Sequence, residues 1–412
     1  MQANPAPLVL RNASIFDDGP GSFVSGLDLA CADGNIVAFG HNIPAPDGAT
    51  VIDLDGAYVL PGLIDCHVHL VSSGAPQALT ESQHEHPHIR AIKAAQHAEQ
   101  TLAAGFTTVR DLGAPGHLNV HLADAVADGT ISGPRILAAG MGVTMTGGHG
   151  HGFIAREADG PDEVRKAVRE QLRAGARAIK LFASGGVMTP GVDPRSPSFS
   201  EDELRAGVEE AHKAFRVVGA HAQATAGIKN AIRAGVDSIE HGVWLDEEAI
   251  GLMVEHGTYL VPTLTAPHHI AHGGLDAGIP PYAVEKGWQV LQAHIDSYQA
   301  ALRAGVRVAM GTDQGTPMNR PGQNAQEILR LAEYGLKPEE AILAATARAA
   351  DLLGLAEECG RIREGLAADL VVLARDPLAN LTALAEPQEF AGIVKGGTQV
   401  RWRTTHTTGG TG

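Results

Sequence analysis

Short apolar runs alternate with longer segments of helical periodicity through the middle of the chain. Alternation of this kind predicts parallel strands covered by helices, because a parallel connection needs a long crossover that a helix commonly supplies. The strand-like runs are 57–64 leading into 65–70, and then 106–111, 134–138, 178–182, 218–222, 238–242, 258–263 and 308–313. Eight strand–helix units are typical of an α/β fold closed into a (β/α)8 TIM barrel.

The segments between these runs carry the signals of helices. Apolar residues recur at helical spacing in 87–104, 117–127, 161–174, 201–217, a segment ending at 234, 246–256 and a long segment ending at 304. Asp162 and Glu163 lie in the first turn of the third helix, where carboxylates complement the helix dipole. Ser200 is placed to cap the fourth helix.

Both ends of the chain have a different pattern. Residues 8–60 contain short apolar strands separated by turns, and strand-like runs return at 368–373 and 392–395. A β module this short is marginal alone, so we expect the two ends to combine. The predicted domains are a small β-sandwich made of residues 1–60 plus 355–412, and a barrel catalytic domain of residues 61–354.

Composition narrows the possible partners. The chain has 412 residues, 44% of them hydrophobic, and a net charge of −16. Nucleic acid and anionic membranes are excluded as expected partners, because phosphate backbones and anionic surfaces favour Lys and Arg. No apolar run approaches the roughly 20 residues of a membrane-spanning helix. We expect a small-molecule substrate and a homo-oligomer, whose subunit number the sequence does not fix.

Cysteine content and the N-terminal sequence bear on location. The three cysteines, Cys31, Cys66 and Cys359, give no disulfide framework. We interpret Cys66 as a packed core thiol, because it points to the opposite face of its strand from the two neighbouring histidines. Without a basic start and an apolar segment at the N-terminus, a cytoplasmic location is the default expectation. A signal peptide trimmed from the natural precursor stays open.

Residue types that bind metals end five of the strand-like runs. His67 and His69 are two positions apart, so their side chains project from one face of a strand. Lys180, His221, His241 and Asp313 end four later runs. In a barrel these ends meet at one face, where neutral imidazoles and a carboxylate suit Zn²⁺ and also Co²⁺ or Mn²⁺. The alternatives are ordinary core histidines and a Lys180 paired with a carboxylate such as Asp313.

The ordered set of HxH, Lys, His, His and Asp resembles the amidohydrolase superfamily. The words PGLIDCHVHL, IKLFASGGV, SIEHG and GTDQGTP are similar to its imidazolonepropionase-related branch, which includes carboxypeptidases acting on Xaa-Pro or N-acyl amino acids and ochratoxin-hydrolysing enzymes. The resemblance, from about Leu8 to Trp402, implies two divalent metal ions, with zinc expected. His67, His69 and Asp313 would hold one, His221 and His241 the other, and a CO₂-derived carbamate on Lys180 would bridge them.

The resemblance also implies roles in catalysis. Metals lower the pKa of water to near 7, and Asp313 would act as the general base. His149, in a Gly-rich loop, would contact substrate and stabilise the oxyanion, and His151 would also contact substrate. Arg195 and Arg320, in loops, are candidates for binding a substrate carboxylate. The alternative interpretations are structural loop histidines and solvent-exposed arginines.

The predicted function is a binuclear amidohydrolase that cleaves the amide of N-acyl amino acids or dipeptides, including Xaa-Pro or ochratoxin A, by metal-activated hydroxide. The alternative is a mononuclear deaminase or cyclic amide or amidine hydrolase of the same superfamily, which Lys180 disfavours because such relatives typically lack it. A catalytically inactive binding protein is a third possibility.

Two further histidine clusters are expected in loops at the barrel mouth. One contains His84, His86 and His88, and the other contains His268, His269 and His272.

Overall fold

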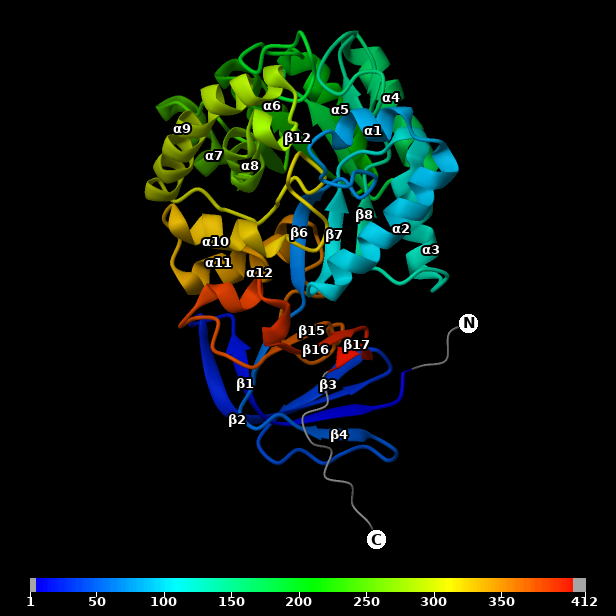
Figure 1. The fold of residues 1–412 in the computed structure, drawn as a ribbon, viewed down its shortest axis with the longest axis vertical. Coiled ribbons are helices and arrows are strands. Elements are labelled where there is room, and N and C mark those ends of the chain that lie inside the picture. The colour runs from blue at the N-terminus through cyan, green and yellow to red at the C-terminus, as the bar shows by residue number, and fades with distance from the viewer. Residues whose placement is uncertain (1–4, 403–412) are drawn as a thin grey trace.

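The computed structural model describes residues 5–402 (Figure 1). Residues 1–4 and the Thr- and Gly-rich segment 403–412 lie outside the described part. Within 5–402, no helix is both long enough and apolar enough to cross a membrane.

One sheet contains strands from both ends of the chain, and we call it the terminal sheet. Its order is β17-β16-β15-β5-β1-β2-β3, with β4 paired to β1. The two ends join directly, because β5 pairs antiparallel with β15. The strands are β1 (Leu8–Asp17), β2 (Ser22–Ala32), β3 (Asn35–Gly40), β4 (Thr50–Asp53), β5 (Tyr58–Pro61), β15 (Leu370–Leu373), β16 (Phe390–Lys395) and β17 (Thr398–Trp402). A sandwich and the boundaries 1–60 plus 355–412 and 61–354 stay predictions.

Two parallel sheets form the other part of the molecule. The order is β6-β7-β8 in one sheet and β10-β9-β11-β12-β13-β14 in the other. The strands are β6 (Leu63–Val68), β7 (Phe106–Asp111), β8 (Arg135–Ala138), β9 (Gly142–Thr144), β10 (Ala155–Glu157), β11 (Ala178–Phe182), β12 (Val217–Ala222), β13 (Ser238–His241) and β14 (Tyr259–Val261). The predicted α/β class is therefore confirmed, and β9 and β10 are additional short strands.

Backbone hydrogen bonds connect the two parallel sheets. On one side, the Arg177 N–H donates to the Ala138 carbonyl at 2.8 Å, which links β8 to the start of β11. On the other, Val308 forms a parallel bridge with Leu260 and the Cys66 N–H donates to the Met310 carbonyl at 2.9 Å. In the segment predicted as an eighth strand, 308–313, only Val308 forms an isolated bridge, and the Met310 N–H donates to the Ala344 carbonyl rather than to a neighbouring strand. Closure into a barrel stays a prediction.

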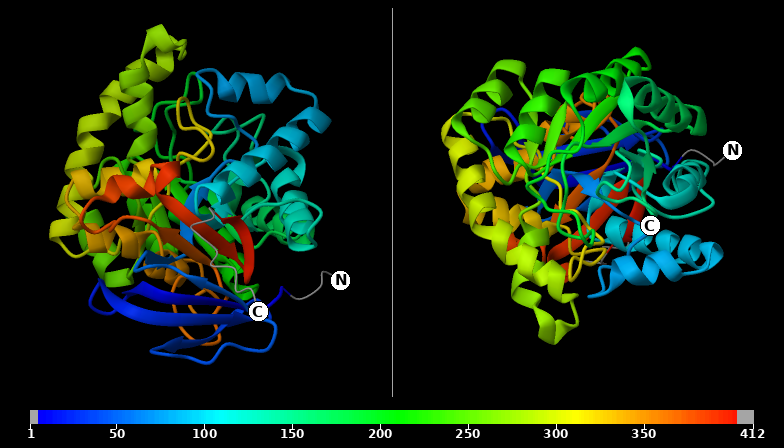
Figure 2. Two further views of the ribbon diagram at one scale, coloured as in Figure 1. Left: turned by 60° about the horizontal axis from the view of Figure 1, so that its bottom comes forward. Right: turned by 90° about the horizontal axis from the view of Figure 1, so that it is seen from above.

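Helices surround the parallel strands, as the view from above shows (Figure 2). They are α1 (Ala78–His84), α2 (Pro87–Ala103), α3 (Leu118–Ala127), α4 (Gly160–Ala174), α5 (Glu201–Lys213), α6 (Thr225–Ala234), α7 (Glu247–His256), α8 (Thr265–Gly273), α9 (Pro281–Arg303), α10 (Ala325–Glu333), α11 (Pro338–Ala344) and α12 (Ala347–Leu352). The seven predicted helices are present as α2 to α7 and α9. Helix α5 ends before the predicted residue 217, because Phe215 has a φ of 58° and β12 begins at Val217.

Helix α8 corrects the prediction of a loop around His268, His269 and His272. It begins at Thr265, four residues after the last residue of β14, and buries Ala266, Pro267 and Ile270. The helix was not predicted because three of its nine residues are histidines, which interrupt the apolar pattern in the sequence.

The direction of β6 relates the two parts of the molecule. The Gly62 N–H, just before β6, donates to the Asp369 carbonyl beside β15 at 2.7 Å. Strand β6 therefore begins at the terminal sheet and runs away from it, so the carboxyl ends of the parallel strands face the opposite way (Figure 1). The terminal sheet has an apolar cluster of its own, whereas its residues Phe16, Leu60 and Phe390 belong to the large apolar cluster of the parallel strands. Leu10, Leu29, Val59 and Leu370 belong to the core of the terminal sheet.

Candidate active site

A pocket with about 1220 Å³ of empty space, part of it open to solvent, lies at the carboxyl ends of the parallel strands. Eight of the predicted site residues line it: His67, His69, His149, His151, Lys180, His221, His241 and Asp313. They come from the ends of β6, β11, β12 and β13 and from loops after other strands. The sequence therefore predicted which side chains the fold brings together.

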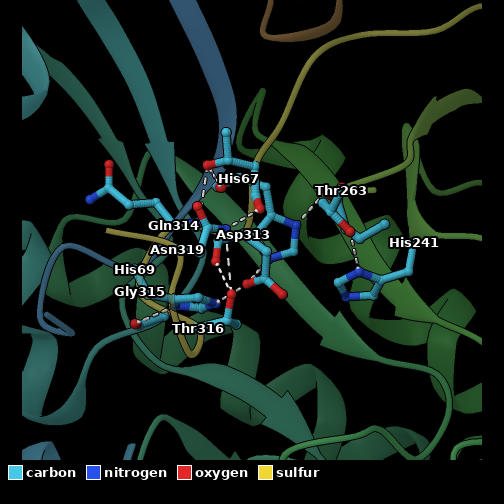
Figure 3. A network of polar contacts seen from close by, with 12 residues as sticks. His67, His69, His241, Thr263, Asp313, Gln314, Gly315, Thr316 and Asn319 are labelled. Atoms are coloured by element: carbon cyan, nitrogen blue, oxygen red, sulfur yellow. Dashed lines mark hydrogen bonds and ion pairs between the residues drawn. The ribbon is translucent and has the colours of Figure 1, made fainter. Parts of the chain in front are cut away.

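His67, His69 and Asp313 form a group that can hold a metal ion (Figure 3). One ligand atom from each lies within 4.8 Å of the others. The Nε2 atoms of both histidines are 3.4 Å from Asp313 Oδ1. Two imidazoles and a carboxylate at this spacing fit a divalent cation such as Zn²⁺.

His221 and His241 continue this cluster. Their ring centroids are 4.5 Å apart, and His241 lies 5.3 Å from His67. Burial lowers the pKa of His67, His221 and His241 well below the usual value for histidine. All three rings are therefore neutral near pH 7, which is the form that binds a metal.

Each of the four histidines directs one ring nitrogen to a protein acceptor and leaves the other nitrogen for a ligand. The acceptor contacts are His67 Nδ1 to Glu240 Oε2 at 2.8 Å, His69 Nδ1 to the Gly113 carbonyl at 3.1 Å, His221 Nε2 to the Gly185 carbonyl at 2.9 Å, and His241 Nδ1 to Thr263 Oγ1 at 2.7 Å. Metal-binding histidines characteristically use their second nitrogen in this way, because the hydrogen bond fixes the tautomer and the ring orientation.

Lys180 is a buried amine at the centre of the pocket floor. Its Nζ is enclosed and, among the described residues, none forms a hydrogen bond with it. The alternative interpretation, an ion pair with Asp313, is therefore not what the structure contains. Burial lowers the pKa of Lys180 to about 8 and raises the pKa of Asp313 to about 7. An unpartnered buried amine is costly unless something else occupies the site, so Lys180 fits a group that binds there.

A buried ion pair, Glu240 with Arg110, holds the His67 ring on the side away from Asp313, and the sequence interpretation missed it. Glu240 accepts from His67 Nδ1 and also from Arg110 Nη2 at 2.7 Å, and both side chains are fully buried. Arg110 Nε donates to the Cys66 carbonyl at 2.7 Å, which ties the pair to β6. The available signal was a glutamate and an arginine inside runs that were otherwise predicted to be buried strands. Cys66 itself is a buried free thiol.

Three residues at this site have a backbone conformation that L-residues rarely adopt. His241, Thr263 and Asp313 have φ values of 74°, 55° and 58°. Each such residue costs on the order of 1–3 kcal/mol and persists only where its surroundings hold it. The side chains that can contact a metal are thus placed at the expense of local backbone stability.

His149 and His151 lie on the loop that follows β9. His149 Nδ1 contacts Thr189 Oγ1 at 2.7 Å, and its ring lies against Gly186, where a Cβ atom would come within 2.5 Å of Nε2. Burial lowers the pKa of His149 to about 3, so its ring is neutral. His151 Nδ1 contacts the Gly148 carbonyl at 2.7 Å. Both rings line the pocket, and their roles toward substrate stay predictions.

The two predicted carboxylate-binding arginines lie away from the pocket. Arg195 is 69% exposed and pairs with Asp193 at 2.9 Å, and Arg320 is exposed. Neither lines the pocket. Other residues of the same loops, including Met188 and Pro317, do line it, so it is the two arginine side chains that lie elsewhere, and the geometry gives no support to their role in binding substrate. Gln223 does line the pocket, and its Oε1 is buried without a hydrogen-bond partner in the described structure.

The chain is similar to known proteins over most of its length. The sequence profile of the amidohydrolase family matches residues 58–400. An ochratoxinase from Aspergillus niger is 37% identical over 371 residues, which cover 82% of this chain and 75% of that protein.

Two solved structures are similar over nearly the whole chain. A prolidase complexed with N-methylphosphonate-L-proline has a TM-score of 0.90 and 35% identity, covering 96% of this chain and 100% of the other. A Xaa-Pro dipeptidase with methionine bound in its active site has a TM-score of 0.87 and 32% identity, covering 96% of this chain and 99% of the other.

Proposed function

Because this chain belongs to the amidohydrolase family, we propose that it is a binuclear metal-dependent enzyme that hydrolyses the amide bond of N-acyl amino acids or dipeptides. The predicted superfamily and the hydrolysis of amide or peptide bonds are confirmed. The observation that carries the finer proposal is the convergence of His67, His69, Lys180, His221, His241 and Asp313 on one pocket.

Two divalent cations, with zinc expected, fit the ligand atoms described above. His67, His69 and Asp313 would hold one ion, and His221 and His241 the other. Lys180, carbamylated by CO₂, would provide an anionic ligand to both, which accounts for a buried amine that has no partner in the described structure. Its lowered pKa supports this proposal, because only the neutral amine adds to CO₂. When bound, such ions supply Lewis acidity and lower the pKa of water.

Asp313 is proposed as the general base. Its carboxylate faces the pocket beside His67 and His69, where it can accept the proton of the attacking water and return it to the leaving amine. His149 is proposed to donate a hydrogen bond from Nε2 to the developing oxyanion, because Thr189 engages its Nδ1.

The pocket walls support an apolar substrate group. Phe153, Phe182, Met188, Pro190 and Ile270 line the pocket together with few charged side chains. With Arg195 and Arg320 elsewhere, His151 and the amide of Gln223 are the candidates on the wall for binding a substrate carboxylate. The similar proteins are named as a prolidase, a Xaa-Pro dipeptidase and an ochratoxinase, so Xaa-Pro dipeptides and ochratoxin A are the substrates to try first.

A second candidate, a mononuclear deaminase or cyclic amide or amidine hydrolase, is favoured by one observation. In the described part of the chain, the group whose ligand atoms all lie within 4.8 Å contains only His67, His69 and Asp313.

We further propose that the two parallel sheets close into one (β/α)8 barrel and that the terminal sheet forms a small second domain. The hydrogen bonds at Arg177 and at Cys66 support that closure.

Metal content and a substrate panel test the proposal together. We expect about two metal ions per chain by elemental analysis, and turnover within a panel of N-acyl amino acids, Xaa-Pro dipeptides and ochratoxin A. One ion per chain with release of ammonia from amidines or aminated rings would favour the second candidate. A fully metallated protein that is inert toward both panels would overturn the enzymatic proposal.

A further inference from the structure

Glu327 is a buried carboxylate that lies outside the proposed metal site. It belongs to α10, and its side chain is fully buried. Its Oε1 accepts from the Leu264 N–H and its Oε2 from the Thr265 N–H, each at 2.8 Å. Within residues 5–402, no ion pair joins Glu327 to a lysine or arginine. The two backbone N–H groups at the start of α8 are therefore its recorded polar contacts.

The residue just before these two N–H groups contacts a candidate metal ligand. Thr263 is fully buried, and its Oγ1 lies 2.7 Å from His241 Nδ1. Its φ of 55° is unusual for a β-branched side chain, because the branched Cβ crowds the backbone in this region. Such a conformation persists only where neighbouring contacts hold it. Figure 3 shows Thr263 beside His241.

Other contacts hold the backbone of His241 without holding Thr263. The His294 ring on α9 contacts the His241 carbonyl at 2.8 Å through Nε2. Glu327 acts on the opposite side, at the two residues that follow Thr263. A carboxylate that accepts from two consecutive N–H groups holds the orientation of both peptide planes. One of these is the peptide between Thr263 and Leu264, so the carboxylate also restrains the backbone conformation of Thr263.

We propose that Glu327 is a positioning residue for His241, which acts by holding the left-handed conformation of Thr263 so that its hydroxyl accepts the Nδ1 proton of His241. This leaves His241 Nε2 free for a metal ion, so the inference rests on the metal site of the proposed function. A cap of α8 that serves only stability is the competing explanation, since a carboxylate at a helix N-terminus is stabilising in itself.

The test is a double-mutant cycle read out by metal binding. The variants are Glu327→Gln, Thr263→Val and the pair, each titrated as apoprotein with Co²⁺ and followed by visible absorption. Glutamine has one acceptor where the carboxylate has two, and valine keeps the shape of threonine but lacks the hydroxyl. We expect each single variant to weaken the weaker Co²⁺ site by about 10- to 100-fold.

The double variant separates the two explanations. If Glu327 acts through Thr263, the pair weakens Co²⁺ binding no more than Thr263→Val alone, within about twofold. Effects that multiply in the pair, or Co²⁺ binding by folded Glu327→Gln that equals wild type, overturn the inference. Glu333→Gln is the matched control, because Glu333 lies on the same helix, is half-exposed and pairs with Arg330. It is expected to bind Co²⁺ like wild type.

Two further measurements keep the inference testable. If Glu327→Gln does not fold, Glu327→Asp replaces it in the cycle, since it keeps the charge but not the reach, and the same outcomes decide. Hydrogen exchange at Leu264 and Thr265 is expected to accelerate in the Glu327 variants and not in Thr263→Val. If wild-type protein binds no Co²⁺ at all, the proposed metal site fails. If wild type binds and the cycle is additive, only the role of Glu327 fails.

Discussion

The terminal sheet and the pocket use the left-handed region of the backbone in opposite ways. In the terminal sheet and its turns, the non-glycine residues with positive φ are Asn12, Asp33, Asn42 and Asp55, with values of 50° to 52°. Asn and Asp tolerate this region because their short polar side chains can hydrogen-bond locally. At the pocket the residues that adopt it are His241, Asp313 and Thr263, and for the β-branched Thr263 it is strongly unfavourable.

Burial of polar groups follows the same division. In the terminal sheet, the buried carboxylates of Asp28 and Asp369 each have a guanidinium partner, Arg11 and Arg135 respectively. The pocket floor contains an unpartnered amine, Lys180, and the carboxylates of Asp313 and, behind it, Glu240. In the terminal sheet, backbone and burial preferences agree with the fold and add to its stability. At the pocket, several of these preferences are violated together, which is expected of a functional site that the surrounding structure holds in place. Five experiments test this contrast.

Loss of the Lys180 side chain is expected to have the largest effect. Lys180→Ala should reduce kcat/KM by more than about 1,000-fold, because the shared ligand of both metal ions is removed. With the metal ions removed from both proteins, the melting temperature should stay level or rise, since the variant no longer buries an amine without a partner. Partial recovery of activity with a short carboxylate in solution would support the carbamate. Turnover like that of wild type would exclude it.

Removal of the metal ions should affect the pocket and leave the terminal sheet unchanged, and both effects can be measured on a single sample. Dialysis against a chelator is expected to abolish amide hydrolysis, and Zn²⁺ should restore it. Circular dichroism should change little, because the terminal sheet and the apolar cores contain no metal ligands. Activity that survives complete removal of metal, as checked by elemental analysis, would contradict the proposed chemistry.

Replacement of the proposed base should act on turnover. Asp313→Asn is expected to lower kcat by about 10²- to 10⁴-fold with KM nearly unchanged, since proton transfer contributes in the transition state. Metal content is measured in parallel, because Asp313 is also a proposed ligand. A variant that keeps its metals and its kcat but loses affinity would show that Asp313 is not the base.

A substitution in the terminal sheet should give the reverse result. Leu10 is fully buried there. Leu10→Ala is expected to lower the free energy of unfolding by about 2–5 kcal/mol, through lost transfer energy and the cavity left behind. In the fraction that stays folded, kcat/KM should remain within about twofold of wild type. A large loss of kcat/KM in fully folded protein would mean that the two regions are coupled.

The smallest effect is expected at the surface, outside both regions. His212 Nε2 lies 2.9 Å from Asp237 Oδ2, and this hydrogen bond raises the pKa of His212. A pKa raised by folding adds stability that is fully present below the unfolded value of 6.5 and is lost as pH rises through the folded value. His212 is 43% exposed, so the contribution is below about 1 kcal/mol. Comparing wild type with His212→Gln by denaturant unfolding at about pH 5.5 and about pH 9 should show a difference at the lower pH only.

Sequence order was enough to find the proposed ligand residues that line the pocket, because each one ends an apolar run and parallel strands place those ends together. It was not enough for Glu240, Thr263 and Glu327, whose roles depend on contacts with residues distant in the chain or on an unusual φ. For Arg195 the sequence left a substrate contact and solvent exposure open, because a loop sequence does not state where its side chains point, and the structure has it exposed. It satisfies its charge with Asp193, two residues earlier.

The position of the chain ends has a practical consequence. Leu8 and Trp402, where the first and last described strands begin and end, both belong to the terminal sheet, whereas β6 carries its histidines away from that sheet. A tag, a fusion partner or a solid support attached beyond either residue would therefore lie behind the catalytic face. Immobilised on a resin through one end, the protein would keep its entrance turned toward the passing solution.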